Sequence, residues 1–216
     1  MDNLKTTLSK FNSTFSMKEF KNSETLVFPI IVDKIPYGNF IEILGEPGKG
    51  KSTLALLIAN YISKKNKIVA YINGEYSLDS LYLKKLNIDK ELLVINPSEF
   101  SIDIIDLICT LSKKVDLIIL DSLACIDYED IKKNIGKLIA TISHSNCSLI
   151  YTNQMRGKTI KKREVHSYGG YDLKKQCSIR LEVEKMINQS GISFEINIIK
   201  NKLSSVLGEQ IYNFKN

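Results

Sequence analysis

The segment from Gly45 to Ser52, GEPGKGKS, constrains this chain more than any other feature. It fits the pattern GxxxxGKS without a mismatch. The apolar run from Phe40 to Leu44 before it predicts a strand, and residues 53–60 after it predict the beginning of a helix. A strand, a glycine-rich loop and a helix in this order form a phosphate-binding loop, where backbone N–H groups and the positive end of the helix dipole hold phosphate oxygens.

Individual residues of this loop have predicted roles. Pro47 has no N–H, so the amide cradle begins at Gly48. Lys51 would neutralise the outer phosphates of a nucleoside triphosphate, and the Ser52 hydroxyl would ligate Mg²⁺. The alternative is a glycine-rich turn capped by a serine, which would not require the strand before it and the helix after it. The predicted nucleotide-binding residues are Gly45, Glu46, Pro47, Gly48, Lys49, Gly50, Lys51, Ser52 and Thr53.

Bulk composition narrows the class of protein. The 216 residues suit one domain with a full core, or one domain plus a small appendage, and 44% hydrophobic with 25% charged residues is typical of a globular protein. No apolar stretch has the length of a membrane span, and residues 1–5 lack the apolar core of a signal peptide, so we expect a cytoplasmic protein. The net charge of +6 permits an anionic partner such as nucleic acid, although a lysine excess also serves solubility. The four cysteines are widely spaced, which favours buried, reduced thiols over a zinc site or disulfides.

The order of elements predicts an α/β fold. Apolar strands at 40–44, 67–72, 92–95, 116–120 and 148–152 alternate with helices at 79–86, 101–113 and 128–143. Continuous apolar strands between amphipathic helices indicate a mostly parallel sheet covered on both faces. Residues 178–184 and 192–199 instead alternate apolar and polar residues around a turn, which predicts C-terminal antiparallel strands. We expect residues 1–27 to form a helical arm used in oligomerisation, and residues 28–216 to form the core.

Two acidic residues follow predicted strands on the edge where ligands of open α/β sheets bind. Asp121 comes directly after the strand at 116–120 and would hold Mg²⁺ through the ion or its water shell, although an aspartate there could also cap a turn. Glu75 follows the strand that ends at Ile72 and could activate a water for hydrolysis. Spacing alone leaves Glu75 equally compatible with a solvated loop.

The stretch from Gln154 to His166 is strongly basic and ends near two glycines, which predicts a long loop over residues 154–170. Clustered cations with flexible glycines suit a nucleic-acid backbone, with an affinity that falls as salt rises. Without a nucleotide site beside it, a solvated basic loop would be the better interpretation. The predicted DNA-binding residues are Arg156, Lys158, Lys161, Lys162, Arg163, Gly169 and Gly170.

Several segments resemble the bacterial RecA recombinase family. The matching segments are residues 69–89 (VAYINGEYSLDSLYLKKLNID), 116–122 (DLIILDS), 151–156 (YTNQMR), 169–170 (GG), 178–181 (SIRL) and 199–202 (IKNK). Their order and approximate separations also agree, over roughly residues 36–212. Because several matches lie outside any general ATPase motif, the resemblance is specific.

This resemblance implies roles for particular residues. Glu75 matches the family's catalytic glutamate, and Asp79 and Tyr82 match residues at the adenine. Gln154 matches the glutamine that senses the γ-phosphate of ATP and couples it to the DNA-binding loop. Lys200 and Lys202 match a lysine pair that reaches the ATP of the neighbouring subunit, where it would stabilise phosphoryl charge as an arginine finger does. The implied ligands are ATP, Mg²⁺ and single-stranded DNA, and the implied assembly is a homo-oligomeric filament.

The sequence also departs from the family. The connection between Asp121 and Ser148 is shorter, and the family's first DNA-binding loop has no counterpart in it. The second loop is shorter and more basic, Lys175 stands where the family has an interface aromatic residue, and no match to the family's C-terminal domain is present. These departures favour single-strand binding and ATP hydrolysis over full strand exchange. They leave open a regulatory paralogue that modulates another recombinase's filament, while a stand-alone nucleotide kinase is disfavoured by the lysine pair and the lack of a lid segment.

Overall fold

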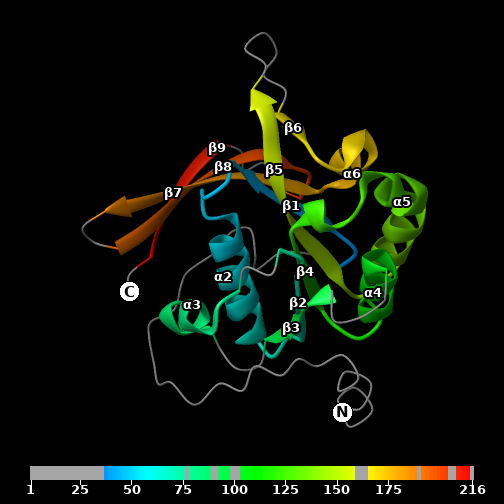
Figure 1. Ribbon diagram of the computed structural model, residues 1–216, viewed down its shortest axis with the longest axis horizontal. Coiled ribbons are helices and arrows are strands. Elements are labelled where there is room, and N and C mark those ends of the chain that lie inside the picture. Colours follow the sequence, from blue (N-terminus) through cyan, green and yellow to red (C-terminus); the bar gives the residue numbers. More distant parts are fainter. Residues whose placement is uncertain are drawn as a thin grey trace.

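A computed structural model describes residues 37–75, 78–88, 92–97, 103–158, 165–188, 191–203 and 208–214. Within these residues, nine strands form one sheet in the order β3-β2-β4-β5-β1-β7-β8-β9, with β6 paired to β5 (Figure 1). The strands are β1 Phe40–Gly45, β2 Val69–Asn73, β3 Leu93–Ile95, β4 Leu117–Asp121, β5 Ser148–Lys158, β6 Val165–Ser167, β7 Ile179–Asn188, β8 Gly191–Asn201 and β9 Gly208–Phe214.

The sheet is parallel from β3 through β7 and antiparallel from β7 through β9. This arrangement confirms the predicted mixed sheet with C-terminal antiparallel strands. All five residues of β2 and β4, and all six of β1, are buried. Strands covered on both faces need apolar residues at every position, which explains why their sequences do not alternate.

Helices cover both faces of the sheet (Figure 1). On one face lie α2 (Lys51–Ser63) and α3 (Ser80–Lys85), which pack on strand residues such as Tyr71 and Ile119. On the other lie α4 (Ile104–Leu111), α5 (Tyr128–Ser143) and α6 (Gly170–Gln176), which pack on neighbours of opposite parity such as Ile118 and Leu120. The alternation of side chains along each strand therefore divides the apolar residues into two cores.

Aspartates begin three of these helices. Asp79, Asp103 and Asp127 each accept a hydrogen bond from a backbone N–H in the first turn of α3, α4 and α5. Such caps satisfy N–H groups that have no partner within the helix. They also explain why the predicted starts of α3 and α5 agree with the structure to within one residue.

The structure differs from the predicted elements at the basic segment and beyond it. β5 continues to Lys158 and pairs with β6, so the predicted loop over residues 154–170 begins and ends as an antiparallel ribbon. The helix α6 and the strand β9 had no sequence signal strong enough to predict them, because α6 has seven residues and β9 is a mixed polar segment. The N-terminal arm (1–27) and residues 159–164 lie outside the described residues.

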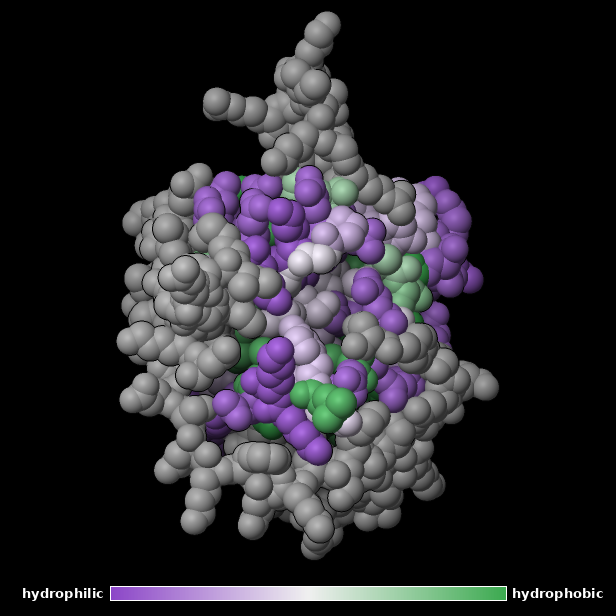
Figure 2. All heavy atoms as spheres, turned by 60° about the vertical axis from the view of Figure 1, so that its left-hand side comes forward, coloured by the Kyte–Doolittle hydropathy of each residue, from purple (hydrophilic) through white to green (hydrophobic). Residues whose placement is uncertain are grey.

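Two composition-based expectations can be compared with the structure. Cys109, Cys147 and Cys177 are buried, and Cys125 is half-buried, as the spacing of the cysteines predicts. Among the described helices, none combines the length and the apolar character that crossing a bilayer requires. Figure 2 shows the side of the molecule at the left of Figure 1. Among the described residues on this side, hydrophilic side chains predominate and the hydrophobic patches are small.

Candidate active site

The glycine-rich loop connects β1 to α2 at the carboxyl end of the parallel strands. Gly45 is the last residue of β1, and Lys51 is the first of α2. Gly50, which caps α2, has φ 88°, and a Cβ there would lie 2.8 Å from the Phe194 ring and 2.9 Å from Lys185 Cβ. Because L-residues disfavour this φ and the β7–β8 ribbon leaves no space for a side chain, glycine is required at this position.

Lys51 is held close to the loop. Its side chain is almost completely buried, and its Nζ donates a hydrogen bond to the Glu46 carbonyl at 3.0 Å. Burial lowers the pKa of Lys51, while the negative charges of Glu75 and Asp121 oppose that shift. The ammonium group thus has a carbonyl partner in the loop and two carboxylates in range, an arrangement that suits binding a phosphate and a metal ion. Ser52, one residue further into α2, is half-buried.

Asp121 ends β4 and is 1% exposed. One carboxylate oxygen accepts a hydrogen bond from the Tyr71 hydroxyl at 2.6 Å, and the other accepts one from the Thr152 hydroxyl. Burial, together with Asp121, raises the pKa of Tyr71 well above its ordinary value, so the phenol stays protonated and donates. These hydroxyls fix the carboxylate without neutralising its charge.

Asn73 lies beside Asp121 at the same edge of the sheet. The two residues are partners in the parallel pairing of β2 with β4. The side-chain oxygen of Asn73 is the buried side-chain polar atom that has no hydrogen-bond partner within the described residues. A buried carboxylate next to an unpaired amide oxygen is a donor set that fits Mg²⁺, which prefers oxygen ligands and keeps several waters.

Glu75 is hydrogen-bonded to the end of β4 through both its backbone and its side chain. Its N–H donates to the Asp121 carbonyl at 3.2 Å, and its carboxylate accepts a hydrogen bond from the Ser122 hydroxyl. The preceding Gly74 permits this approach, because a Cβ there would lie 2.4 Å from Cys125 Sγ. Glu75 is exposed, so water reaches a carboxylate whose position is fixed. The structure therefore brings Glu75, Asp121 and Lys51 together, as the sequence predicts.

The predicted adenine residues belong to α3 and its N-cap, and one of them contacts the first turn of α2. The Tyr82 hydroxyl forms a hydrogen bond with the Thr53 hydroxyl, which places α3 against α2 next to the loop. Asp79 is exposed and accepts a hydrogen bond from the Leu81 N–H at 3.1 Å as the cap of α3. Asp79 thus has a structural role that is compatible with a second one at a nucleotide base.

Gln154 lies next to the start of the loop. It is the partner of Gly45 in the parallel pairing of β1 with β5. Side chains alternate along a strand, so Gln154 is on the same face of β5 as Thr152, the face that carries Asp121 and α2. Gln154 is exposed and directly precedes Met155, where β5 begins to pair with β6.

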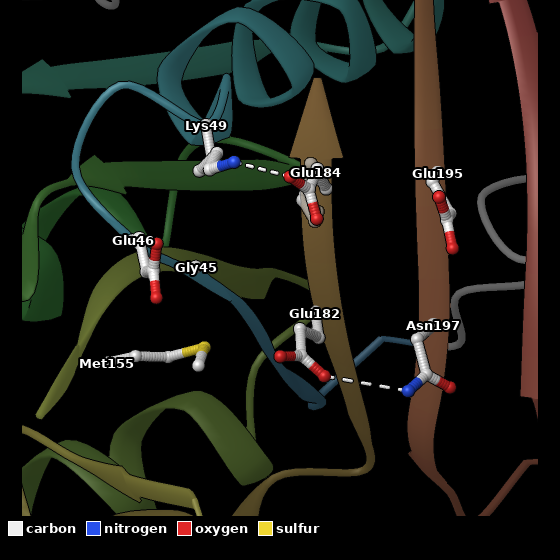
Figure 3. Close-up of a pocket in the computed structure, with 9 residues that line it drawn as sticks. Gly45, Glu46, Lys49, Met155, Glu182, Glu184, Glu195 and Asn197 are labelled. Carbon is white, nitrogen blue, oxygen red and sulfur yellow. Dashed lines mark hydrogen bonds and ion pairs between the residues drawn. The ribbon is translucent and has the colours of Figure 1, made fainter. Parts of the chain in front are cut away.

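Lys49 points away from the predicted phosphate cradle. Its Nζ forms an ion pair with Glu184 of β7, which raises the pKa of Lys49. Figure 3 shows this pair beside a cavity of about 340 Å³, into which β7 and β8 direct polar side chains. The lining residues include Glu46, Met155, Glu182, Glu195 and Asn197. The structure therefore connects Lys49 with the β7–β8 ribbon, a contact that the sequence does not predict.

Lys200 and Lys202 lie level with the first half of β1 and not with the loop at its end. Lys200 pairs with Arg180, which pairs with Glu42 near the start of β1, whereas the loop follows the end of β1. Lys200 Nζ donates to the carbonyls of Lys174 and Lys175 at 2.8 and 3.0 Å. Lys202 Nζ donates to the Lys175 carbonyl at 2.9 Å, so both lysines bind the C-terminal end of α6. Burial, and then the charge of Lys202, lowers the pKa of Lys200.

The predicted DNA-binding residues divide into three groups. Arg156 and Lys158 belong to β5, while Lys161, Lys162 and Arg163 lie outside the described residues. Gly169 caps α6 and Gly170 is the first residue of that helix, with φ of 94° and 78°. The start of the basic segment therefore lies on the edge of the sheet that carries the glycine-rich loop.

Sequence reasoning missed several polar residues of this edge. Tyr71, Asn73, Ser122, Thr152 and Asn153 were not singled out, although each hydrogen-bonds within the site or next to it. The sequence signal that could have found these residues is a polar side chain at or near the end of an otherwise apolar strand. That signal is weak, because the sequence does not say which strands are neighbours.

The fold and this site define the class of P-loop nucleoside triphosphatases. Within that class, the RecA N-terminal domain family matches residues 21–213. The chain is 35% identical to Protein RecA of Thermus aquaticus over 199 residues, and 33% identical to Protein RecA of Mycoplasmopsis pulmonis over 197 residues. These matches cover 79% and 78% of this chain and 58% of each relative, so the chain spans somewhat over half the length of these curated relatives. The chain belongs to the RecA family.

Solved structures agree with this fold. The RadB recombinase matches with a TM-score of 0.61 and 16% identity, over 82% of this chain and 87% of that chain. The flagellar accessory protein FlaH from Methanocaldococcus jannaschii matches with a TM-score of 0.53 and 17% identity, over 82% and 85%. At these identities the likeness describes the fold alone.

Proposed function

We propose that this protein is an ATPase that binds single-stranded DNA as a RecA-like homo-oligomer and acts in DNA recombination or repair. The observation that supports this most is the single edge of the sheet that holds Lys51, Glu75 and Asp121 together with Gln154. A nucleotide bound there would contact the residue from which the basic segment begins.

The residues of the site suit distinct tasks. The loop amides from Gly48 onward and Lys51 would bind the phosphates, and Ser52 with Asp121 would hold Mg²⁺, which supplies charge stabilisation when bound. Glu75, fixed by Ser122 yet open to water, would orient and activate the attacking water. Tyr82 and Asp79 would lie at the base, on the α3 side of the loop.

The lysine pair supports an assembled enzyme. Lys200 and Lys202 lie level with the first half of β1, and their side chains bind α6 and not the loop, so they would reach a nucleotide of a neighbouring copy rather than their own. Positive charge delivered from a second subunit would make hydrolysis depend on assembly. ATP would then be bound between two copies of the chain, and Gln154 would report its γ-phosphate to the basic segment.

The decisive experiment measures ATP hydrolysis with and without single-stranded DNA, at low and at moderate salt. We expect stimulation by DNA at low salt that declines as salt rises, because phosphate contacts release counterions. Lys51→Ala serves as the control that loses ATP binding or turnover. Hydrolysis that DNA never stimulates at low salt would rule out the proposed coupling.

A regulatory RecA paralogue, which binds ATP and modulates another recombinase's filament, is the second candidate. It is favoured by the short connection after Asp121, where η2 (Leu123–Cys125) leads almost directly into α5, and by the lysine pair bound to α6 of its own chain. Electron microscopy with an ATP analogue and DNA distinguishes the candidates. A continuous helical filament of this chain alone would argue against the regulatory role.

A further inference from the structure

Asn73 is a buried polar residue at the carboxyl edge of the sheet, and its side chain is only half satisfied. The residue ends β2 and is 4% exposed. Its Nδ2 donates a hydrogen bond to the Asn96 side-chain oxygen at 2.8 Å, whereas its Oδ1 has no partner within the described residues. Because a buried acceptor without a hydrogen bond destabilises a fold, such an atom indicates a ligand that completes it.

Asn96 determines which way the amide of Asn73 points. Asn96 directly follows β3, which pairs with β2 on one side, while β4 pairs with β2 on the other. Because the nitrogen is bound toward β3, the oxygen is turned away from β3. Asp121 is the register partner of Asn73 on β4. Neighbouring strands lie about 4.8 Å apart, so the unpaired oxygen and the Asp121 carboxylate are close enough to share one ion or one of its waters.

Both side chains lie on the face of the sheet that is covered by the helix after the glycine-rich loop. Alternate residues of a strand share a face, so Asn73 is on the face of Tyr71, whose hydroxyl binds Asp121. The helix on that face is α2, which begins with Lys51 and Ser52. The unpaired oxygen is therefore on the side of the sheet where Ser52 and Asp121 would hold Mg²⁺.

Asn73 supplies an oxygen without a charge. A carboxylate at this position would lie beside that of Asp121, and the two would repel each other unless a cation stayed bound between them. With an amide there, the nearby carboxylates are Asp121 and Glu75, whose charges Lys51 partly balances. In the described part of the chain, no group of three or more acidic, histidine or cysteine side chains could hold a metal ion. A metal ion therefore needs the phosphates of a nucleotide as further ligands.

We propose that Asn73 is a further residue of the metal site: its Oδ1, oriented by Asn96, accepts a hydrogen bond from a water bound to Mg²⁺, and its neutrality makes metal binding depend on the nucleotide. Magnesium keeps several of its waters in protein sites, and the outer-shell partners of a metal site contribute about 10- to 100-fold to metal affinity. The inference rests on the proposed binding of ATP, and not on DNA.

Binding of a non-hydrolysable ATP analogue, measured with and without Mn²⁺, tests the role of the oxygen without any turnover. In the unmodified protein, we expect Mn²⁺ to strengthen analogue binding. In Asn73→Leu, which keeps the approximate size of the side chain and removes the oxygen, this strengthening should be about tenfold smaller. The affinity of Asn73→Leu for the analogue in the absence of metal should stay within twofold of the unmodified protein.

Asn73→Asp tests the role of neutrality, because it keeps an oxygen and adds a charge. Free Mn²⁺ has a sharp electron paramagnetic resonance signal that is lost on binding, so metal affinity can be measured without nucleotide. We expect Asn73→Asp to bind Mn²⁺ at least tenfold more tightly than the unmodified protein does in the absence of the analogue. Equal Mn²⁺ binding by the two proteins would contradict the dependence on neutrality.

Asn60→Leu is the matched control. Asn60 is a buried asparagine of α2 whose amide donates to the Asn87 carbonyl at 3.2 Å. We expect Asn60→Leu to keep the Mn²⁺ effect on analogue binding within twofold. If Asn73→Leu also keeps that effect, the unpaired oxygen binds a structural water only, and the proposal is overturned.

Nuclear magnetic resonance of the unmodified protein tests the proposal even where the variants do not fold. The side-chain amide signals of Asn73 are expected to shift when Mg²⁺ is added to the complex with the analogue, while those of Asn60 stay in place. Asn73 signals that do not respond to Mg²⁺ contradict the proposal.

Failure of this inference and failure of the proposed function give different results. A protein that binds no analogue, with or without Mn²⁺, contradicts both. If Mn²⁺ strengthens analogue binding equally in Asn73→Leu and in the unmodified protein, the inference fails alone. If the Mn²⁺ effect depends on Asn73 but DNA never stimulates hydrolysis, the inference stands and the proposed coupling to DNA fails.

Discussion

β4 carries an aspartate at each end, and the two differ in how their charge is satisfied. Asp116, just before the strand, accepts hydrogen bonds from the Tyr37 hydroxyl, from Lys67 Nζ and from the Ile68 N–H, each at 2.9 Å. Asp121, at the other end, is buried and accepts hydrogen bonds from two hydroxyls. Both residues belong to the same short segment, DLIILDS, yet of the two only Asp116 forms an ion pair with a lysine, Lys67.

The pKa of Asp116 reflects its complete set of partners. Burial alone would raise the pKa, but the Ile68 N–H and then Lys67 and Tyr37 outweigh it, so the pKa of Asp116 lies below 3.8. The same cluster raises the pKa of Lys67 to about 12, first through Tyr37 and then through Asp116. A carboxylate that is neutralised locally joins two segments of the chain, whereas one that is only hydrogen-bonded keeps its charge for a cation. Asp116 is therefore structural, and Asp121 is suited to a metal.

The largest expected effect is that of Asp121→Asn. Removing the charge should lower ATP turnover about 1000-fold, a size typical of lost electrostatic stabilisation of the transition state. The free energy of unfolding should stay the same or rise, because a buried charge is removed while the shape is kept. Steady-state kinetics and denaturant unfolding measure the two quantities. Asp116→Asn is the matched control, and an equal loss of turnover in it would remove the distinction between the two ends of β4.

Glu75→Gln should lower turnover by about 100-fold or more, the usual contribution of a general base. Nucleotide affinity should persist, because Gln keeps the acceptor for Ser122 and the metal carboxylate is intact. Single-turnover kinetics with a separate binding measurement tests this expectation. A variant that hydrolyses ATP normally would mean that Asp121 and Lys51 act without Glu75.

The lowered pKa of Lys51 predicts that nucleotide affinity changes by about tenfold per pH unit. Its ammonium loses the proton below the ordinary pKa of 10.5, so nucleotide affinity should fall as the pH rises through that lowered value. The free protein should gain stability over the same range, because the charged form is the one that burial disfavours. Calorimetric titration against pH measures the affinity. In Lys51→Arg the pH dependence should disappear, since a guanidinium stays charged; if it persists, Lys51 is not the titrating group.

Asp116→Ala should have the smallest effect, a loss of about 1 kcal/mol in the free energy of unfolding with turnover unchanged. The lowered pKa of Asp116 means that its contribution is present above pH 3.8 and is lost as the pH falls through the folded value. The raised pKa of Lys67 means that its part is present below 10.5 and is lost as the pH rises through about 12. Denaturant unfolding at several pH values measures this. A change in turnover would show that the two ends of β4 are coupled.

The parts of the site that follow one another in the chain were predictable. The strand, loop and helix around Gly45 to Ser52, and the aspartate at the end of a buried strand, depend on local rules: residue preferences, glycine geometry and apolar periodicity. The same rules predicted most strands and helices, and the aspartate caps set the starts of α3 and α5. The continuation of β5 over residues 155–158 was predicted as a loop, because a charged segment that pairs only with β6 has no apolar pattern.

The sequence by itself determined that this chain carries a phosphate-binding loop in a parallel α/β sheet, because those properties are encoded within a few consecutive residues. Only the tertiary structure decided which distant polar groups meet. Ser122 with Glu75, Asn153 with Glu42 and Tyr168, and the lysine pair with α6 are contacts between segments that strand order and register bring together. A hydrogen bond requires its partners within about 3 Å, and no local pattern specifies a distance across the sheet.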